Sequence, residues 1–172
     1  MPENRAYPPE GLTPPAPYTL AELRSAMESR AVVEGVARRC DAALNLSVQL
    51  GRISAIMPRE EATAPWISGA NREIAVLSRV GKPICCTVES IAADAKGAPL
   101  VTVSRRQAQE QAMDAMLENL RPGSVVAGRV VRTEPFGAFV DIGRGIVALL
   151  PTEFISAARI RRPEQRFRTG QR

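Results

Sequence analysis

Two phenylalanines in the last third of the chain could stack on unpaired nucleobases. Phe136 lies in a turn marked by Pro135 and Gly137, and Phe139 lies in the alternating strand pattern that follows. The apolar set of that strand is complete without Phe139: Ala138, Val140 and Ile142. The alternation therefore predicts Phe139 on the solvated face beside Asp141. Two rings on a polar surface form a stacking platform, although both rings could instead close the end of a small barrel core.

Arginine supplies the second kind of chemistry. Residues 121–172 carry ten arginines and four acidic side chains, net +6, whereas residues 1–120 carry 13 basic and 14 acidic side chains, net −1. A basic excess beside exposed aromatic rings indicates a polyanionic partner with bases to stack. In the strands, Arg129, Arg132 and Arg144 are the expected phosphate contacts. The arginines from Arg159 to Arg168 either add less specific attraction or form a solvated loop.

The remaining composition excludes several other kinds of chemistry. The chain has no histidine, and its three cysteines do not have metal-ligand spacing. Without paired carboxylates in a recognisable setting or a glycine-rich phosphate loop, no catalytic constellation can be assembled, so we expect no enzyme, metal or cofactor. No apolar run is long enough to span a bilayer and the start lacks a signal-peptide core, which predicts a soluble, cytoplasmic protein without a membrane partner.

The elements that position these residues can be read along the chain. Residues 1–18 are proline-rich and are expected to form a disordered or polyproline-II arm. A capping box at Thr19 predicts a short helix over residues 19–29, and a second capping box at Ser104 predicts a linker helix over residues 107–120. Between them, six segments have strand character: 31–39, 44–50, 53–57, 74–80, 84–91 and 100–103.

The sequences around residues 35 and 128 are similar and form an internal repeat. The matching pairs include Gly35 with Gly128, Arg39 with Arg132, and the Met57-Pro58 and Leu150-Pro151 dipeptides. A matched glycine inside a strand is what a small barrel uses to bend the strand. The repeat predicts two barrels in tandem. In the first copy the two phenylalanine positions fall on Leu44 and Ser47, or on Ala43 and Leu46, so this copy is expected to serve packing or protein contact.

Residues 121–130 and 134–143, with the run Phe-Gly-Ala-Phe-Val at their centre, resemble the S-one RNA-binding motif, the repeated domain of the largest bacterial small-subunit ribosomal protein. The resemblance implies a five-stranded oligonucleotide-binding (OB) barrel. It also implies that single-stranded RNA lies over strands two and three, with Phe136 and Phe139 stacking on bases. The sequence departs from the family at Pro151, which replaces a histidine that helps to contact RNA. We also expect the motif to be incomplete, ending before its fourth strand.

The predicted fold is mainly β with short helices: two tandem OB-type barrels joined by a helix, the second C-terminally incomplete. Residues 30–106 form the divergent copy and residues 121–172 form the S-one motif. The predicted function is binding of single-stranded RNA, either mRNA or rRNA, by a translation- or ribosome-associated protein. The alternative is an adaptor for ribosomal or RNA-processing proteins in which neither barrel binds RNA.

Overall fold

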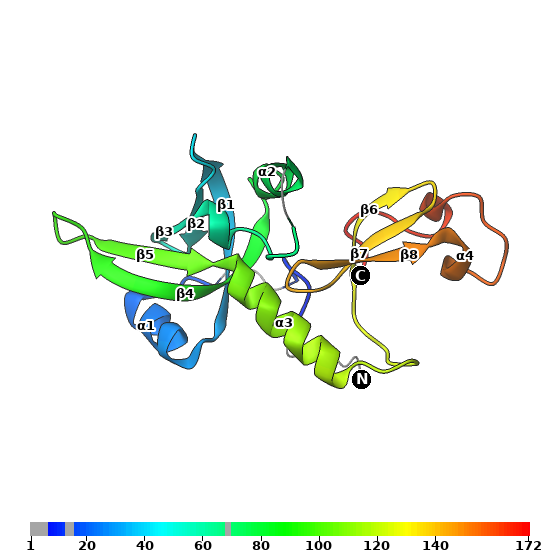
Figure 1. Ribbon diagram of the computed structural model, residues 1–172, viewed down its shortest axis with the longest axis horizontal. Coiled ribbons are helices and arrows are strands. Elements are labelled where there is room, and N and C mark those ends of the chain that lie inside the picture. Colours follow the sequence, from blue (N-terminus) through cyan, green and yellow to red (C-terminus); the bar gives the residue numbers. More distant parts are fainter. Residues whose placement is uncertain (1–6, 13–15, 68–69) are drawn as a thin grey trace. The chain divides into compact units, whose positions relative to one another are not determined.

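A computed structural model describes residues 7–12, 16–67 and 70–172 (Figure 1). The chain divides into two compact units. The barrel unit comprises residues 10–111, and the sheet unit comprises residues 112–172 together with residues 7–9. Helix α3 (Arg105–Asn119) starts in the barrel unit, two residues before the expected linker helix, and continues into the sheet unit.

Five strands of the barrel unit close into a barrel in the order β1-β2-β3-β5-β4. The strands are β1 (Val32–Cys40), β2 (Leu46–Leu50), β3 (Ile53–Met57), β4 (Pro83–Ala93) and β5 (Pro99–Ser104). All neighbours pair antiparallel except β3 and β5, which run parallel and close the barrel. Five strands in a closed barrel give the unit an OB-like architecture.

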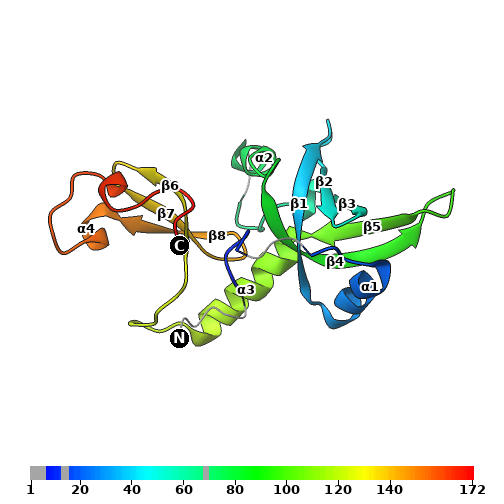
Figure 2. The same cartoon turned by 180° about the vertical axis from the view of Figure 1, so that it is seen from behind.

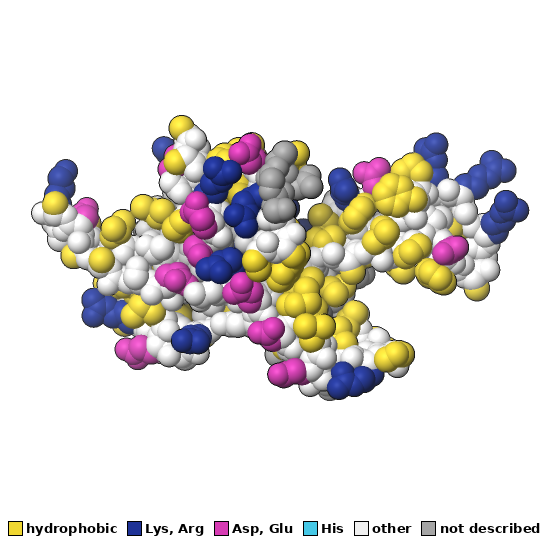
Figure 3. Space-filling view, in the orientation of Figure 1, with side chains coloured by type: hydrophobic (Ala, Val, Ile, Leu, Met, Phe, Trp, Pro, Cys, Tyr) yellow, Lys and Arg dark blue, Asp and Glu magenta, His cyan; other side chains and the backbone are white. Residues whose placement is uncertain are grey.

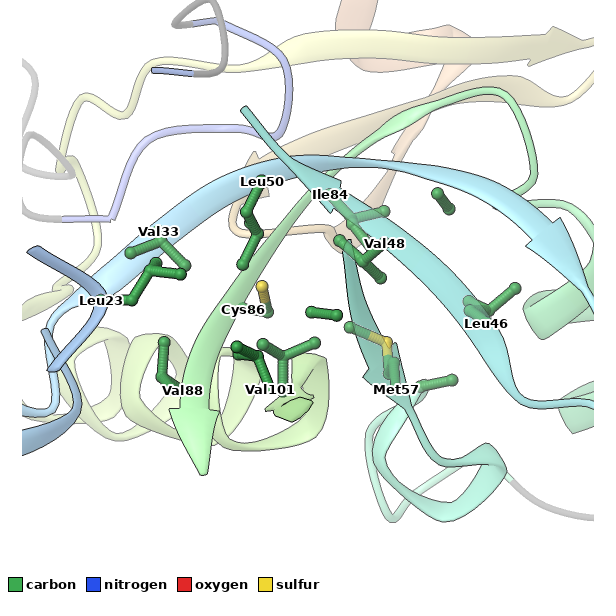
Figure 4. Packing of buried hydrophobic residues seen from close by; sticks show 14 of the residues in the cluster. Leu23, Val33, Leu46, Val48, Leu50, Met57, Ile84, Cys86, Val88 and Val101 are labelled. Atoms are coloured by element: carbon green, nitrogen blue, oxygen red, sulfur yellow. The ribbon is translucent and has the colours of Figure 1, made fainter. Parts of the chain in front are cut away.

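The core of the barrel follows directly from strand alternation. Leu46, Val48 and Leu50 of β2 point inward and are fully buried, among strands that contribute Val33, Met57 and other apolar residues (Figure 4). Helix α1 (Leu20–Ser29) begins at the predicted capping box and lies against β4, where it buries Leu23 in the same core (Figure 2).

The segment predicted as a strand over residues 74–80 is instead helical. Helix α2 (Ala70–Leu77) follows the short 3-10 helix η1 (Arg59–Glu61), and its residues Ile74 and Leu77 are exposed while Val76 is buried. A short apolar run has the same composition in a strand and in a helix, so the sequence pattern could not separate them. The parallel pairing of β3 with β5 already closes the sheet, which leaves no strand position for this segment.

Glu10, expected within a disordered arm, is buried in the barrel unit. Its carboxylate accepts hydrogen bonds from Arg105 Nε at 2.7 Å and Arg105 Nη2 at 2.9 Å, and Arg79 Nη1 lies at 3.4 Å. Burial acts to raise the pKa of Glu10, but the two guanidinium groups and the Cys85 N–H outweigh it and hold the pKa below its usual value. Glu10 thus anchors its segment to the barrel.

The disordered-arm prediction is therefore wrong for residues 7–12, because Tyr7 is buried as well as Glu10. Proline-rich composition could not reveal a salt-bridge partner 95 positions further along the chain. Residues 16–18 are described as well, and the Tyr18 hydroxyl accepts a hydrogen bond from Glu34 N at 3.2 Å, so the prediction is also wrong there. Residues 1–6 and 13–15 of the predicted arm lie outside the described residues.

The sheet unit contains a three-stranded antiparallel sheet in the order β6-β7-β8. Its elements are β6 (Arg129–Glu134), β7 (Gly137–Gly143), β8 (Ile146–Pro151), α4 (Thr152–Ile155) and the 3-10 helix η2 (Pro163–Gln165). Tyr7 packs with Ala112, Met116 and Ile146 in a small core of this unit. The described residues show one closed barrel and one open sheet, so a second barrel stays a prediction.

The C-terminal residues of the chain lie along β6. Gly170 N donates to Val130 O at 2.7 Å, and Val130 N donates to Gln171 O at 2.9 Å. Within the described residues of the whole chain, no helix combines the length and the apolar character needed to cross a membrane.

Candidate nucleic-acid interface

One face of the three-stranded sheet carries a row of three side chains, one from each strand. Arg132 of β6 pairs with Phe139 of β7, which in turn pairs with Leu149 of β8. Directly opposed residues point to the same face, so the three side chains are neighbours on one surface. Leu149 is half-exposed there, whereas Ala138, next to Phe139 in sequence, is fully buried on the other face. Phe139 therefore lies on the side that the alternation predicts.

The two predicted stacking rings are brought together. Phe136, in the turn between β6 and β7, is 59% exposed, and its ring centroid lies 6.1 Å from that of the half-buried Phe139. The ring planes meet at 84° in an edge-to-face arrangement. This geometry is favourable for an aromatic pair and therefore favours this orientation of the two rings.

Arg132 lies over the ring of Phe139, with its guanidinium carbon 4.3 Å from the ring centroid. A β-bulge between Val130 and Arg132 shifts the register of β6 and sets Arg132 opposite Phe139. The guanidinium also lies 3.7 Å from the carboxylate of Glu134, in an exposed ion pair. Such pairs contribute little, so this contact leaves the guanidinium available to a ligand.

The other two predicted arginines lie elsewhere on the sheet. Arg129, at the start of β6, pairs with Asp141 rather than with either phenylalanine. Arg144 lies in the turn between β7 and β8, at the opposite end of β7 from Phe136. Its backbone is left-handed, with a φ of 47°, and its N–H donates to Pro8 O at 2.9 Å. The structure thus groups Arg132 with the two rings, but not Arg129 or Arg144.

The alternation predicts Asp141 on the solvated face beside Phe139, and the structure contradicts this prediction. It is buried, and its Oδ1 accepts hydrogen bonds from Gly143 N at 2.9 Å and Gly145 N at 3.1 Å. The carboxylate therefore shapes the turn between β7 and β8, and the register shift between Asp141 and Gly143 ends the simple alternation.

A groove begins beside Phe136, and the sequence reasoning did not anticipate it. Its volume is about 650 Å³. Phe136 forms one wall, and the others come from Pro151, α4 and the loop after it: Thr152, Glu153, Ser156, Ala157, Ala158, Arg159 and Ile160. Thr152 fixes α4 to the turn that holds Phe136, because Thr152 N donates to Phe136 O at 3.0 Å and Thr152 Oγ1 donates to Pro135 O at 3.1 Å.

The space-filling view of the sheet unit shows arginine side chains projecting near exposed hydrophobic side chains (Figure 3). Exposed hydrophobic residues of this unit include Phe136, Val147, Leu149 and Phe154. Among the residues that the structure describes, no group of three or more His, Cys, Asp or Glu side chains is arranged to hold a metal ion.

The corresponding strands of the barrel unit show the same pairing with different side chains. Arg39 of β1 pairs with Ser47 of β2, which pairs with Ile56 of β3, and a bulge again precedes the arginine. An added Cβ at Gly35 would meet Val48 Cγ1 at 2.8 Å, and one at Gly128 would meet Val140 Cγ1 at 2.5 Å. The two sheets therefore share a strand geometry, but a serine stands opposite Arg39 where Phe139 stands opposite Arg132.

Together these features define a mainly β protein with an OB-like barrel and a second sheet that carries an aromatic and arginine surface. Residues 119–172 match the family described as "S1 RNA binding domain", which is the S-one motif, and the relatives below support the S1 family for this region. The match contains Phe136, Phe139 and all three predicted arginines.

The chain is also similar to curated proteins named small ribosomal subunit protein bS1. It is 40% identical over 75 residues to the protein of Neisseria meningitidis, covering 41% of this chain and 13% of that protein. For Staphylococcus aureus the identity is 35% over 75 residues, covering 41% and 19%. For Leuconostoc lactis it is 30% over 152 residues, covering 88% and 33%. The chain thus spans between about an eighth and a third of the length of these relatives.

Proposed function

We propose that the sheet unit binds single-stranded RNA on the face that carries Arg132, Phe136 and Phe139. The observation that carries this proposal is the placement of a guanidinium group over one of two adjacent aromatic rings on an accessible sheet surface. Bases offer a flat π-face, so aromatic rings and guanidinium planes bind them with little dependence on sequence. The match of residues 119–172 to an RNA-binding family supports the choice of RNA as the ligand.

The roles of the arginines follow from their positions. Arg132 offers its plane to a base while its N–H groups reach toward a phosphate, which a lysine ammonium group could not do. Arg129 and Arg144 bind phosphates further along the strand, away from the ring pair. The net charge of +6 in residues 121–172 raises the local concentration of RNA and makes the affinity depend on salt.

We further propose that the protein is non-enzymatic and works at the ribosome in the cytoplasm, with mRNA or rRNA as the ligand. The names of the bS1 relatives support ribosome association for this chain. We also infer that the two units derive from one repeated module. The shared bulge, the shared glycine and the matching strand register support this reading.

Fluorescence anisotropy of a labelled single-stranded RNA against the full chain tests the proposal. Phe136→Ala and Phe139→Ala are each expected to weaken binding by about 1–3 kcal/mol, because each removes a stacking surface. Phe154→Ala is the matched control, since Phe154 is exposed in the same unit but is absent from the ring pair. Unchanged affinity in both Phe136 and Phe139 variants would refute the stacking role.

Salt dependence provides the second arm of the same test. Contact of Arg129, Arg132 and Arg144 with about three phosphates predicts roughly an 18-fold loss of affinity between 50 and 200 mM salt, from a slope of about −0.7 per phosphate for single strands. An affinity that stays flat over this range would show that the arginines do not contact phosphates.

A protein-contact role has one specific observation in its favour, and it concerns the barrel unit. Trp66, Ile74 and Leu77 are all at least half-exposed in or near α2. Exposed apolar side chains of this size are typical of interaction surfaces. Recovery of a stoichiometric protein partner after nuclease treatment, lost on changing Ile74 and Leu77 to serine, would support this second function.

A further inference from the structure

The perpendicular arrangement of Phe136 and Phe139 restricts the path of any strand that stacks on both. A base that lies flat on an aromatic ring takes the plane of that ring. Because the two ring planes meet at 84°, the two bases would also lie nearly perpendicular to each other. Adjacent bases in a continuous stack are nearly parallel, so these two bases cannot stay stacked together.

Arg132 adds to this restriction. Its guanidinium carbon lies 4.3 Å from the centroid of the Phe139 ring, so a base at this position meets the Arg132 guanidinium group as well as the ring. Phe136 has no such contact among the described residues, and at 59% exposure it is the more accessible of the two rings. The two rings therefore differ in exposure and in contact with a guanidinium group, as well as in the orientation of their planes.

The groove beside Phe136 is the place where a base turned away from Phe139 can go. Phe136 forms one wall of the groove, and Ala157, Ala158 and Arg159 belong to the loop that lines another part of it. The hydrogen bonds from Thr152 to the backbone of residues 135 and 136 fix the position of α4 relative to the ring. Arg159 adds a positive charge to the lining of the groove.

We propose that a bound RNA strand turns between Phe139 and Phe136, and that the base at Phe136 leaves the stack and enters the groove lined by residues 151–160. The site is a subsite for one nucleobase with its plane against Phe136, and the neighbouring base stays on Arg132. This inference rests on the proposed RNA binding. It adds a requirement on the RNA: one step of the strand must be free to unstack.

The experiment uses pentanucleotide RNAs that carry two adjacent 2-aminopurine bases at each of the four possible steps. Two stacked 2-aminopurines give an exciton couplet in circular dichroism, and unstacking removes it. At protein concentrations that saturate binding by anisotropy, the couplet is expected to fall by more than half at one step and to persist at the others. A couplet that persists at all four steps in the saturated complex would overturn the proposal while leaving RNA binding intact.

Three variants separate the groove from the rest of the surface. Phe136→Leu removes the ring, and Ala157→Leu fills the groove while keeping the ring; both are expected to restore the couplet in RNA that remains bound through Arg132. Phe154→Leu is the control. It makes the same change at a second exposed phenylalanine, which lies on α4 and does not line the groove. It should lose the couplet as the native chain does. If the couplet is also lost in the Ala157→Leu variant, the base does not enter this groove. If the native chain does not bind RNA, both this inference and the proposed function are overturned.

Discussion

Removing the charge of Glu10, which forms a buried ion pair with Arg105, should strongly destabilise the barrel unit. Both side chains are 5% exposed, and Arg79 reaches the same carboxylate with 20% exposure. Glu10→Gln keeps the shape but leaves the buried guanidinium group of Arg105 and the partly buried one of Arg79 facing a neutral amide. Breaking a buried pair in this way typically costs 3–5 kcal/mol. We expect about 3 kcal/mol, because the amide oxygen still accepts one hydrogen bond and Arg79 can reach water.

Urea unfolding followed by the fluorescence of Trp66 measures this cost. Trp66 is the one tryptophan of the sequence and lies in the barrel unit. With an m-value of about 2 kcal/mol/M, a loss of 3 kcal/mol lowers the midpoint by about 1.5 M. Glu28→Gln, at an exposed position on α1, is the matched control and should leave the midpoint unchanged. A midpoint for Glu10→Gln equal to that of the control would refute the role assigned to the ion pair.

The same carboxylate predicts a dependence on pH. The pKa of Glu10 in the folded protein lies below the usual value for a glutamate, so the folded state favours the ionised form. Its contribution to the free energy of unfolding is full above about pH 4.5 and is lost as the pH falls through the folded pKa. The native chain should therefore lose more stability than Glu10→Gln on acidification below pH 4.5. Parallel curves for the two proteins would contradict this assignment.

Three further changes test other parts of the structure. Arg132→Lys keeps the charge but loses the planar guanidinium group, so RNA affinity should fall about two- to fivefold. An unchanged affinity would mean that Arg132 contributes only its positive charge. Gly35→Ala places a Cβ within 2.8 Å of three atoms of β2, which should cost about 1–3 kcal/mol by urea unfolding; an unchanged midpoint would mean that the strands move apart freely. Cys85 and Cys86 are buried, and burial raises the pKa of Cys86 to about 12, whereas Cys40 is partly exposed. Cys40 should therefore react fastest with a thiol reagent at pH 8, and equally rapid reaction of three thiols without denaturant would contradict the closed barrel.

Most strands could be predicted from local pattern because alternation is a local signal. The strand over residues 53–57 coincides with β3, and the strands at 31–39 and 84–91 differ from β1 and β4 by a few residues at their ends. The capping box at Thr19 located the start of α1 for the same reason, since its hydrogen bonds join residues three apart. Local chemistry therefore determines where these elements lie.

The errors have the opposite character, because each depends on contacts distant in sequence or on backbone geometry. Glu10 is ordered by Arg105 through a contact that no local pattern contains. Asp141 is buried because a bulge and a glycine-rich turn take up its carboxylate. The helix α2 replaces a predicted strand because the barrel is already closed by β3 and β5. The groove beside Phe136 could not be predicted either, because it is formed by a loop whose path depends on Thr152.

The sheet of the sheet unit and the corresponding strands of the barrel unit share a backbone arrangement but differ in the side chains that it carries. Each places an arginine after a bulge, opposite a residue in the first half of the second strand, and each has a glycine, in or just before the first strand, where that strand approaches the second. The backbone therefore holds an arginine at the same register position in both units. Only the sheet unit has an aromatic ring beneath that arginine and a second ring beside it, since Ser47 stands opposite Arg39. If RNA binding is confirmed for the sheet unit alone, the difference must arise from side chains, namely these rings and the net charge of +6 in residues 121–172, and not from the strand geometry that the two units share.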